Sequence, residues 1–367
     1  MALADGRTIG IALSGGGFRA TLFGLGSLWY LSDIGLLGKL DRVCSVSGGS
    51  ILSGVLAHRW KSLEFEEGKA VNFKPEIADR VLKFCSQTID WQAGVRGLIN
   101  PFKSAGDYLA QRYQDDLFGA TRLIALQPRS QGGAPAFVIY ATNLQTGRSF
   151  RFTQDYVADY YLGINRALNP TLAQAVAASS AFPPIYSPIK LKGNPSDWTE
   201  PDWKGSDSDL KKLQSDLELG DGGIYDNLGL ESLNQDVMLV SDAGAPFLTE
   251  SHIRSNYYSQ LSRVRDILID QTRALRKRAL IESFEQKRKS GTYWGITTLI
   301  DSYPALHKLM ADSESTQALS RIETRLCAFP QQTQARLINW GYALADAAVR
   351  SYVLPEQGLL ERLPMPS

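Results

Sequence analysis

Two stretches near the start of the chain, IGIALSGGGFR at residues 9–19 and DRVCSVSGG at residues 41–49, share one pattern. In each of them a short apolar segment (Ile9–Leu13 and Asp41–Val46) leads into small residues, and apolar residues at helical spacing follow. The pattern predicts a strand, a helix, a strand and a helix in quick succession. Such a repeat is typical of a parallel β-sheet covered by helices, so we expect an α/β fold.

The rest of the chain continues this pattern less regularly. Apolar runs at Phe137–Thr142 and Val237–Val240 predict further buried strands. Residues 60–130 and the chain beyond about residue 250 are expected to be mostly helical. Residues 194–216 are polar and rich in turn formers, which indicates a surface insertion.

The composition narrows the class of protein. Hydrophobic residues make up 44% of the 367 residues, enough for a large core, which excludes a wholly disordered chain. The 39 Lys and Arg residues nearly balance the 38 Asp and Glu residues, so we expect no nucleic-acid partner. The widely spaced Cys44, Cys85 and Cys327 predict neither a disulfide framework nor a zinc site. The N-terminal residues lack the pattern of a signal peptide, and we expect a cytoplasmic enzyme.

Ser47 is the first candidate for chemistry. It follows a predicted strand and precedes a predicted helix, the position at which the G-x-S-x-G motif exposes a nucleophilic serine on a tight turn. Gly49 fits the motif, whereas Ser45 replaces its first glycine with another small residue. The alternative is an ordinary glycine- and serine-rich turn before a helix.

The glycine loop Gly15–Gly17 is the second candidate. Its backbone N–H groups are free of side-chain obstruction, as an oxyanion hole requires, and Arg19 is placed to reinforce the site or to brace the loop. The alternative is a dinucleotide-binding loop, because Gly15, Gly17 and Ala20 fit G-x-G-x-x-A. That motif needs an acidic residue at the end of the second strand, where this chain has the Ser47 turn, so the oxyanion interpretation is favoured.

Asp221, between glycines, is the candidate base. A serine needs a neighbouring base to attack, and His58, His252 and His307 all lie in unsuitable positions along the sequence. A carboxylate that acts directly on Ser47 is the economical solution. The alternative for Asp221 is a turn former.

Together these motifs resemble those of the patatin-like phospholipases, and the resemblance covers about residues 8–245. The matching segments are Gly15-Gly16-Gly17-x-Arg19, the Ser47 turn, Ala178-Ser179-Ser180-Ala181-Phe182-Pro183-Pro184, Asp221-Gly222-Gly223 and Asp226-Asn227-Leu228-Gly229. Asp242 also ends a predicted strand before a small residue, but Asp221 matches the family pattern better because of its double glycine.

The resemblance implies a three-layer α/β/α domain over residues 8–245, with a mainly parallel central sheet, a nucleophile elbow and a helical C-terminal region at residues 250–367. It implies a Ser47–Asp221 dyad that hydrolyses phospholipids or other lipid acyl esters through an acyl-enzyme. Gly15–Gly17 would hold the oxyanion, with Arg19 and Gly48 beside it, and neither a metal nor a cofactor is expected. The alternative is a lipid- or nucleotide-binding effector that is non-catalytic or needs activation by a partner.

Two further segments bear on lipid access. Residues 273–289 carry seven basic and two acidic side chains, which predicts peripheral membrane contact, or alternatively a solvated helix packed on the sheet. Residues 194–216 and the helical stretch after the Ser47 helix are expected to form a mobile cover over the active site. Within that stretch the candidates for an acyl groove are Trp91, Leu98, Ile99 and Phe102.

Overall fold

The computed structural model describes residues 6–89, 104–127 and 133–366. Within them an 11-stranded sheet runs in the order β10-β8-β7-β6-β5-β2-β1-β12-β13, with β11 pairing with both β5 and β9. Its strands are β1 (Ile9–Leu13), β2 (Arg42–Val46), β5 (Ala136–Asn143), β6 (Arg148–Phe152), β7 (Val157–Asp159), β8 (Gly163–Asn165), β9 (Ile189–Lys192), β10 (Trp198–Thr199), β11 (Asp216–Asp221), β12 (Val237–Asp242) and β13 (Ser290–Gly295). A separate hairpin is formed by β3 (Phe65–Glu66) and β4 (Lys69–Ala70).

The centre of the sheet is parallel. Strands β13, β12, β1, β2 and β5 pair in parallel, whereas β6, β7, β8 and β10 extend the sheet in antiparallel pairs. All five residues of β1 are buried, as expected of a parallel strand that is covered on both faces. The predicted α/β fold with a mainly parallel central sheet is therefore confirmed.

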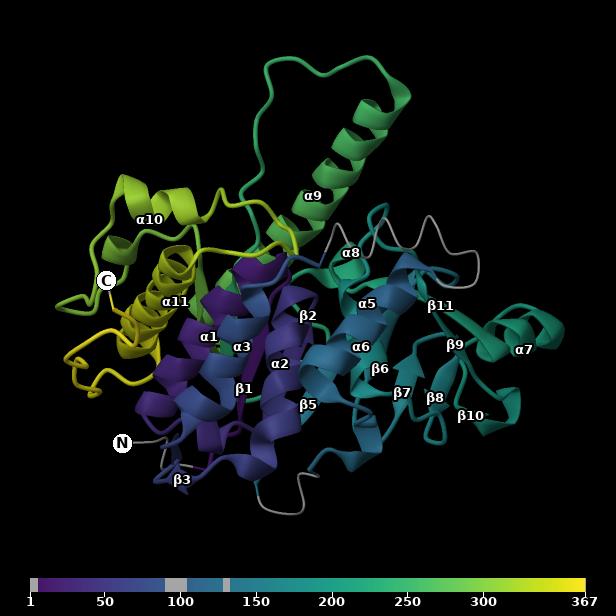
Figure 1. The fold of residues 1–367 in the computed structure, drawn as a ribbon, viewed down its shortest axis with the longest axis horizontal. Coiled ribbons are helices and arrows are strands. Elements are labelled where there is room, and N and C mark those ends of the chain that lie inside the picture. Colours follow the sequence, from purple (N-terminus) through teal and green to yellow (C-terminus); the bar gives the residue numbers. More distant parts are fainter. Residues whose placement is uncertain (1–5, 90–103, 128–132, 367) are drawn as a thin grey trace.

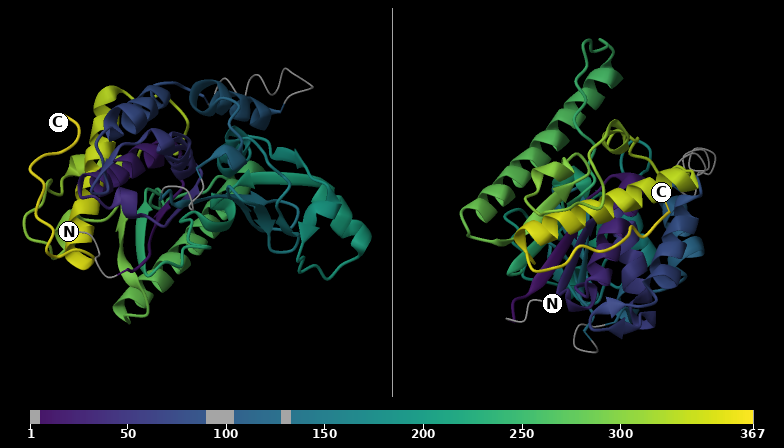
Figure 2. Two further views of the ribbon diagram at one scale, coloured as in Figure 1. Left: turned by 90° about the horizontal axis from the view of Figure 1, so that it is seen from below. Right: turned by 90° about the vertical axis from the view of Figure 1, so that its left-hand side faces the viewer.

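Helices cover both faces of the sheet (Figures 1 and 2). They are α1 (Gly17–Asp33), α2 (Gly48–Arg59), α3 (Asp79–Cys85), α5 (Ala105–Tyr113), α6 (Leu172–Ser180), α7 (Asp207–Ser215), α8 (Gly223–Asp226), α9 (Tyr257–Glu285), α10 (Glu314–Leu319) and α11 (Gln331–Tyr352). The larger core lies on the α1, α2, α6 and α11 side, and a smaller one joins the sheet to the C-terminal half of α9. Within the described ranges, no helix combines the length and the apolar character needed to cross a bilayer.

The helical C-terminal region expected beyond residue 250 is present as α9, α10 and α11, but it also contains a strand. The strand β13 pairs in parallel with β12 along its whole length. The sequence did not predict this strand, because its apolar residues, Tyr293 and Trp294, are too few to show the alternation of a strand and come soon after a basic helix. Tertiary pairing decides the outcome, because Trp294 is fully buried and its Nε1–H donates to Ser27 Oγ at 2.9 Å.

Candidate active site

Ser47 lies on a strained turn between β2 and α2. Its backbone has φ 51° and ψ −119°, a conformation that side-chain-bearing residues rarely adopt and that is found at functional turns. The two following glycines permit the turn, because a Cβ on Gly48 would lie 2.1 Å from the Gly17 carbonyl oxygen and one on Gly49 would lie 2.4 Å from that of Leu13. This is the geometry of a nucleophile elbow.

Ser45, the departure from G-x-S-x-G, is accommodated by hydrogen bonding. Its side chain is fully buried and its Oγ accepts a hydrogen bond from Ser50 Oγ at 3.0 Å. Ser50 Oγ also lies 2.9 Å from Ser179 Oγ, which accepts the Ser47 N–H at 2.9 Å and donates to the Tyr140 carbonyl at 2.6 Å. The hydroxyls of Ser45, Ser50 and Ser179 thus form a hydrogen-bonded network that stabilises the turn at Ser47. Sequence reasoning missed this role of Ser179, although the residue lies in a segment that carried the family resemblance.

Asp221 reaches Ser47 through strand pairing. Val46, the last residue of β2, pairs with Tyr140, and Asp221, the last residue of β11, pairs with the next residue of β5, Ala141. The two strands thus meet end to end along one edge of β5. The Asp221 carboxylate lies beside the Ser47 side chain in the wall of the same cavity, and its Oδ1 accepts the Gly223 N–H at 2.6 Å.

Burial raises the pKa of Asp221 to about 7, although hydrogen bonds from Ser47 and Gly223 lower it in part. A carboxyl group with this pKa is a much stronger base than an ordinary aspartate. It exchanges a proton near neutral pH, as a general base does. Asp221 and Ser47 therefore have both the contact and the proton affinity that a dyad needs.

None of the three histidines of the chain lines the cavity at Ser47, whose walls are made of described residues. His58 Nδ1 lies 3.3 Å from Thr121 Oγ1, and its ring packs edge-on against Phe118. His252 and His307 are exposed. The carboxylate of Asp221 is thus the titratable group in contact with Ser47.

The glycine loop lies beside Ser47, but not every N–H in it is available. The Gly15 N–H donates to the Asn227 carbonyl at 3.0 Å, and the Phe18 N–H donates to the Arg325 carbonyl at 3.1 Å. Among the residues described, the N–H groups of Gly16, Gly17 and Gly48 have no hydrogen-bond acceptor. Gly15 serves instead as a close-approach position, because a Cβ there would lie 3.2 Å from Ser47 Cβ.

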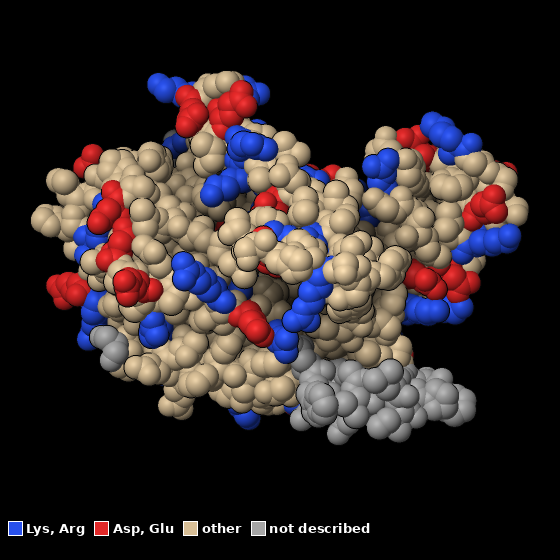
Figure 3. Space-filling view, turned by 90° about the horizontal axis from the view of Figure 1, so that it is seen from above, with Lys and Arg blue, Asp and Glu red and all other residues tan. Residues whose placement is uncertain are grey.

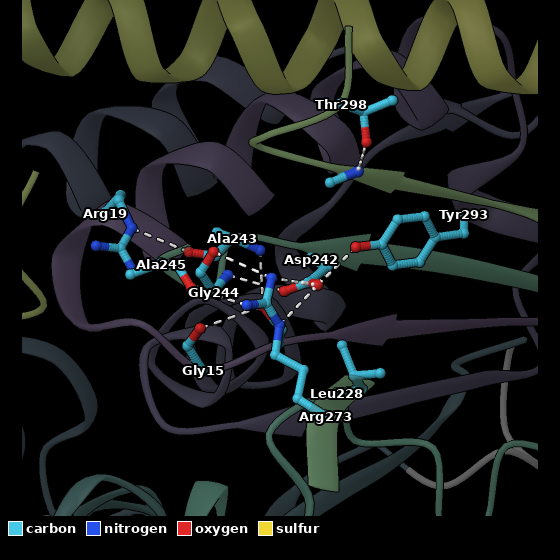
Figure 4. Close-up of polar contacts among 12 residues, drawn as sticks. Gly15, Arg19, Leu228, Asp242, Ala243, Gly244, Ala245, Arg273, Tyr293 and Thr298 are labelled. Carbon is cyan, nitrogen blue, oxygen red and sulfur yellow. Dashed lines mark hydrogen bonds and ion pairs between the residues drawn. The ribbon is translucent and has the colours of Figure 1, made fainter. Parts of the chain in front are cut away.

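Arg19 is buried and braces the loop through backbone contacts (Figure 4). Its Nε–H donates to the Ala243 carbonyl at 2.9 Å and its Nη2 to Thr324 Oγ1 at 2.9 Å, while Nη1 contacts the Ile322 carbonyl. Burial lowers the pKa of Arg19 to about 10, which leaves it charged at neutral pH. Arg19 therefore ties the glycine loop to a C-terminal segment, residues 322–326, through carbonyl and hydroxyl acceptors.

Asp242, the rival aspartate, is engaged elsewhere. Its Oδ2 accepts hydrogen bonds from Arg273 at 2.7 and 3.0 Å and from the Tyr293 hydroxyl at 2.7 Å, as Figure 4 shows. Burial works against its charge, but Arg273 holds the pKa of Asp242 below its ordinary value. This ion pair anchors α9 to the end of β12, which is a structural role.

A sequence profile of the patatin-like phospholipase family matches residues 11–234, more than half of the chain. The chain belongs to the patatin-like phospholipase family. No curated protein sequence matches it.

Among solved structures the chain is similar to the human GIVD cytosolic phospholipase A2, with 14% identity and a TM-score of 0.52 over 92% of this chain and 58% of that one. It is also similar to VipD from Legionella pneumophila, with 16% identity and a TM-score of 0.40 over 92% of this chain and 66% of that one. The chain thus spans less than two thirds of either protein. At 14% identity, the similarity to the human phospholipase shows a shared fold and carries no information on activity.

The cavity at Ser47 and Asp221 of this patatin-like chain has a volume of about 540 Å³. Besides Ser47 and Asp221, its walls contain the glycine-loop residues Gly16, Gly17 and Arg19, the pair Gly223 and Asn227, and residues from three further segments, 180–186, 244–273 and 324–326. The last two lie beyond the family match, and sequence reasoning did not connect them with the site because they reach it only through tertiary packing.

The described parts of the two segments that are expected to cover the site do not form its walls. No described residue of 60–130 or 194–216 lines the cavity. The polar insertion, with α7, lies at the far end of the sheet beside β9 and β10 (Figure 1). The predicted acyl-groove residues Trp91, Leu98, Ile99 and Phe102 lie outside the described residues.

The first three basic residues of the segment 273–289 are engaged within the protein, whereas Arg278, Lys287, Arg288 and Lys289 are exposed. Arg273 binds Asp242, and Arg276 lies 3.6 Å from Asp226 and 3.1 Å from Glu231. Lys277 lies 4.4 Å from the centre of the Tyr293 ring. Membrane contact through this segment stays a prediction.

Proposed function

We propose that the chain is a lipid acyl hydrolase of the phospholipase A or lysophospholipase type that works through a Ser47–Asp221 dyad. The observation that carries the proposal is the meeting of β2 and β11 on β5, which places Ser47 beside the buried Asp221, whose pKa burial raises to about 7. Membership of the patatin-like phospholipase family supports lipid esters as the substrate class. A cytoplasmic location with peripheral access to membranes is part of the same proposal.

In the first half-reaction the Asp221 carboxylate accepts the Ser47 hydroxyl proton while Oγ attacks the ester carbonyl carbon. The N–H groups of Gly16, Gly17 and Gly48 are placed to donate to the resulting oxyanion. When the tetrahedral intermediate collapses, the bond to the alcohol oxygen breaks and Asp221 returns the proton to the leaving alcohol. A water molecule then repeats the sequence on the acyl-enzyme and releases the fatty acid and free Ser47.

The direct test is labelling with a fluorophosphonate probe, combined with mass spectrometry of the acids released from a panel of phospholipids, lysophospholipids and neutral esters. We expect one label, on Ser47, and release of fatty acid from at least one lipid class. Lipid binding without labelling or turnover would contradict the proposal and favour a non-catalytic or partner-activated effector.

A further inference from the structure

Asn227 is a residue of the cavity wall to which the proposed dyad mechanism gives no role. It directly follows α8, the short helical segment that begins two residues after Asp221. Asn227 comes four residues after Gly223, so the two lie on the same face of this turn. Because Gly223 has no side chain, the Asn227 amide can approach the Asp221 carboxylate.

Two glycines bring the Asn227 amide close to both members of the proposed dyad. A Cβ on Gly15 would lie 2.3 Å from Asn227 Oδ1 and 3.2 Å from Ser47 Cβ. A Cβ on Gly223 would lie 2.6 Å from the same Oδ1 and 2.9 Å from Asp221 Oδ1. The space between the amide and either residue is therefore no wider than one small group, such as a methyl group or a water molecule.

The Asn227 amide is available to a ligand. Within the part of the chain that the structure describes, this partly buried side chain makes no hydrogen bond, whereas the Asn227 backbone carbonyl accepts the Gly15 N–H at 3.0 Å. By contrast, the Ser180 hydroxyl in the same wall donates to the Val176 carbonyl at 2.7 Å. A polar group that lacks a protein partner at a cavity wall is suited to hold a polar ligand.

The backbone around Asn227 is held in place by the preceding residue. The Asp226 carboxylate accepts the Leu228 N–H at 3.0 Å and the Leu230 N–H at 2.8 Å, and Arg276 lies 3.6 Å from it. The turn that carries Asn227 is therefore fixed by contacts that do not involve the amide. A group held in this way is preorganised for the ligand that it meets.

We propose that Asn227 Oδ1 holds the water molecule that hydrolyses the acyl-enzyme. The inference rests on the proposed acylation of Ser47. One hydrogen of the water passes to the Asp221 carboxylate while the other is held by Asn227 Oδ1, and the water oxygen attacks the acyl carbon. The bond between this carbon and Ser47 Oγ then breaks, Asp221 returns the proton to Oγ, and the fatty acid leaves.

The placement of Asn227 favours a role toward water over a role in the oxyanion hole. The N–H groups proposed for the oxyanion belong to the N-terminal ends of α1 and α2, at Gly16, Gly17 and Gly48. Asn227 lies instead beside the proposed base. An attacking water has to contact that base directly, whereas a donor to the oxyanion does not.

Water reaches this position past a charged wall. The inward side of α9 contributes Arg265, Asp266, Asp270 and Arg273 to the cavity, and charged groups of this kind favour a hydrated surface. Figure 3, which views the face from which α9 projects, shows basic and acidic side chains around a hollowed region. The cavity thus provides the water that deacylation consumes.

The test compares acylation with deacylation in Asn227→Ala, which keeps the backbone carbonyl that binds Gly15. With a soluble p-nitrophenyl ester, the acyl-enzyme, followed by mass spectrometry after quenching, should decay about tenfold to a hundredfold more slowly than in the wild type. Fluorophosphonate labelling needs attack by Ser47 but no water, so its rate should stay close to that of the wild type. Asn234→Ala, which changes an exposed asparagine outside the cavity, is the control and should alter neither rate.

A conservative variant separates water positioning from a structural role. Asn227→Asp keeps an acceptor oxygen, so it should recover part of the deacylation rate when measured well above neutral pH. Equal losses of labelling and of acyl-enzyme decay in folded Asn227→Ala would overturn the inference, as would decay at the wild-type rate. A wild-type chain that is neither labelled nor able to turn over esters would contradict the proposed function itself, and the inference with it.

Discussion

Ser47 and Asp221 are brought into contact by one strand that neither of them belongs to. The edge of β5 pairs with β2 as far as Val46 and Tyr140, and from Ala141 onward it pairs with β11. Because β2 and β11 run toward each other along this edge, the residue after one strand and the last residue of the other become neighbours. The pairing of the two proposed dyad residues is thus a consequence of sheet topology, with 173 residues of chain between them.

Replacement of Ser47 tests the nucleophile. Ser47→Ala should lower ester hydrolysis roughly 10⁴-fold or more and abolish fluorophosphonate labelling, because only the attacking oxygen is lost. Ser53→Ala is the matched control, since Ser53 is a buried serine of the same helix whose hydroxyl has no partner among the described residues. Labelling that persists in Ser47→Ala would refute the assignment.

Replacement of Asp221 tests the dyad. Asp221→Asn should lose activity by about two to four orders of magnitude, because an amide cannot accept the serine proton while its shape is kept. His58→Gln should retain most activity, since His58 bonds to Thr121 and is not part of the cavity wall. A folded histidine variant without turnover would restore a triad.

The raised pKa of Asp221 predicts the pH dependence of activity. The base acts as a carboxylate, so kcat/KM should rise with pH and reach half its plateau near pH 7. An ordinary aspartate would titrate near 4, and the rate would then be flat through neutrality. Rates measured on a soluble ester at constant ionic strength distinguish the two.

The same pKa predicts that activity and stability change in opposite directions with pH. Activity should rise as Asp221 loses its proton, whereas the free energy of unfolding should fall. Folded Asp221 holds its proton up to about pH 7, whereas the unfolded chain releases it near 4, so its contribution to folding falls as pH rises between these values. Asp221→Asn should therefore unfold at a higher temperature than the wild type well above pH 7. Near pH 4 the difference should vanish, and thermal unfolding at both pH values checks this.

The contact between the glycine loop and the C-terminal segment gives a steric prediction. Gly17 and Gly119 have similar φ angles (+59° and +56°), but of the two only a Cβ on Gly17 meets another atom, the Arg325 carbonyl oxygen at 2.6 Å. Gly119 has ψ −148°, so Gly119→Ala should cost about 1–3 kcal/mol from backbone strain alone and leave activity intact. Gly17→Ala should cost more and also reduce kcat. Equal unfolding free energies for the two variants would argue against the contact.

Ser179 is expected to position the nucleophile without touching substrate. Ser179→Ala leaves the Ser47 N–H and the Tyr140 carbonyl without their partner, so kcat and the labelling rate should fall about tenfold or more while KM changes little. Ser179→Thr, which keeps the hydroxyl, should recover part of the labelling rate. A purely structural role would lower stability in both variants and leave the labelling rate of folded protein unchanged.

The sequence alone determined the local units of the fold. The strands at Ile9–Leu13 and Arg42–Val46, the glycine turns after them, the helix Leu172–Ser180 and the core helix α11 all follow from patterns within a few residues. The elbow belongs to this class only in part, because the positive φ at Ser47 is a local feature, whereas the close approaches of Gly48 to Gly17 and of Gly49 to Leu13 are tertiary contacts.

Only the tertiary structure decided what these units meet. In the folded chain Asp242 binds Arg273 rather than a serine, and the Gly15 N–H donates to the Asn227 carbonyl. Strand β13 pairs with β12 as part of the sheet, and the polar insertion lies away from the cavity. The N-terminal half of α9 exposes an apolar face, which its sequence pattern leaves ambiguous. Contacts of this kind join residues far apart in the chain, and they are fixed by strand pairing and by the burial of charged and apolar groups, which no local pattern encodes.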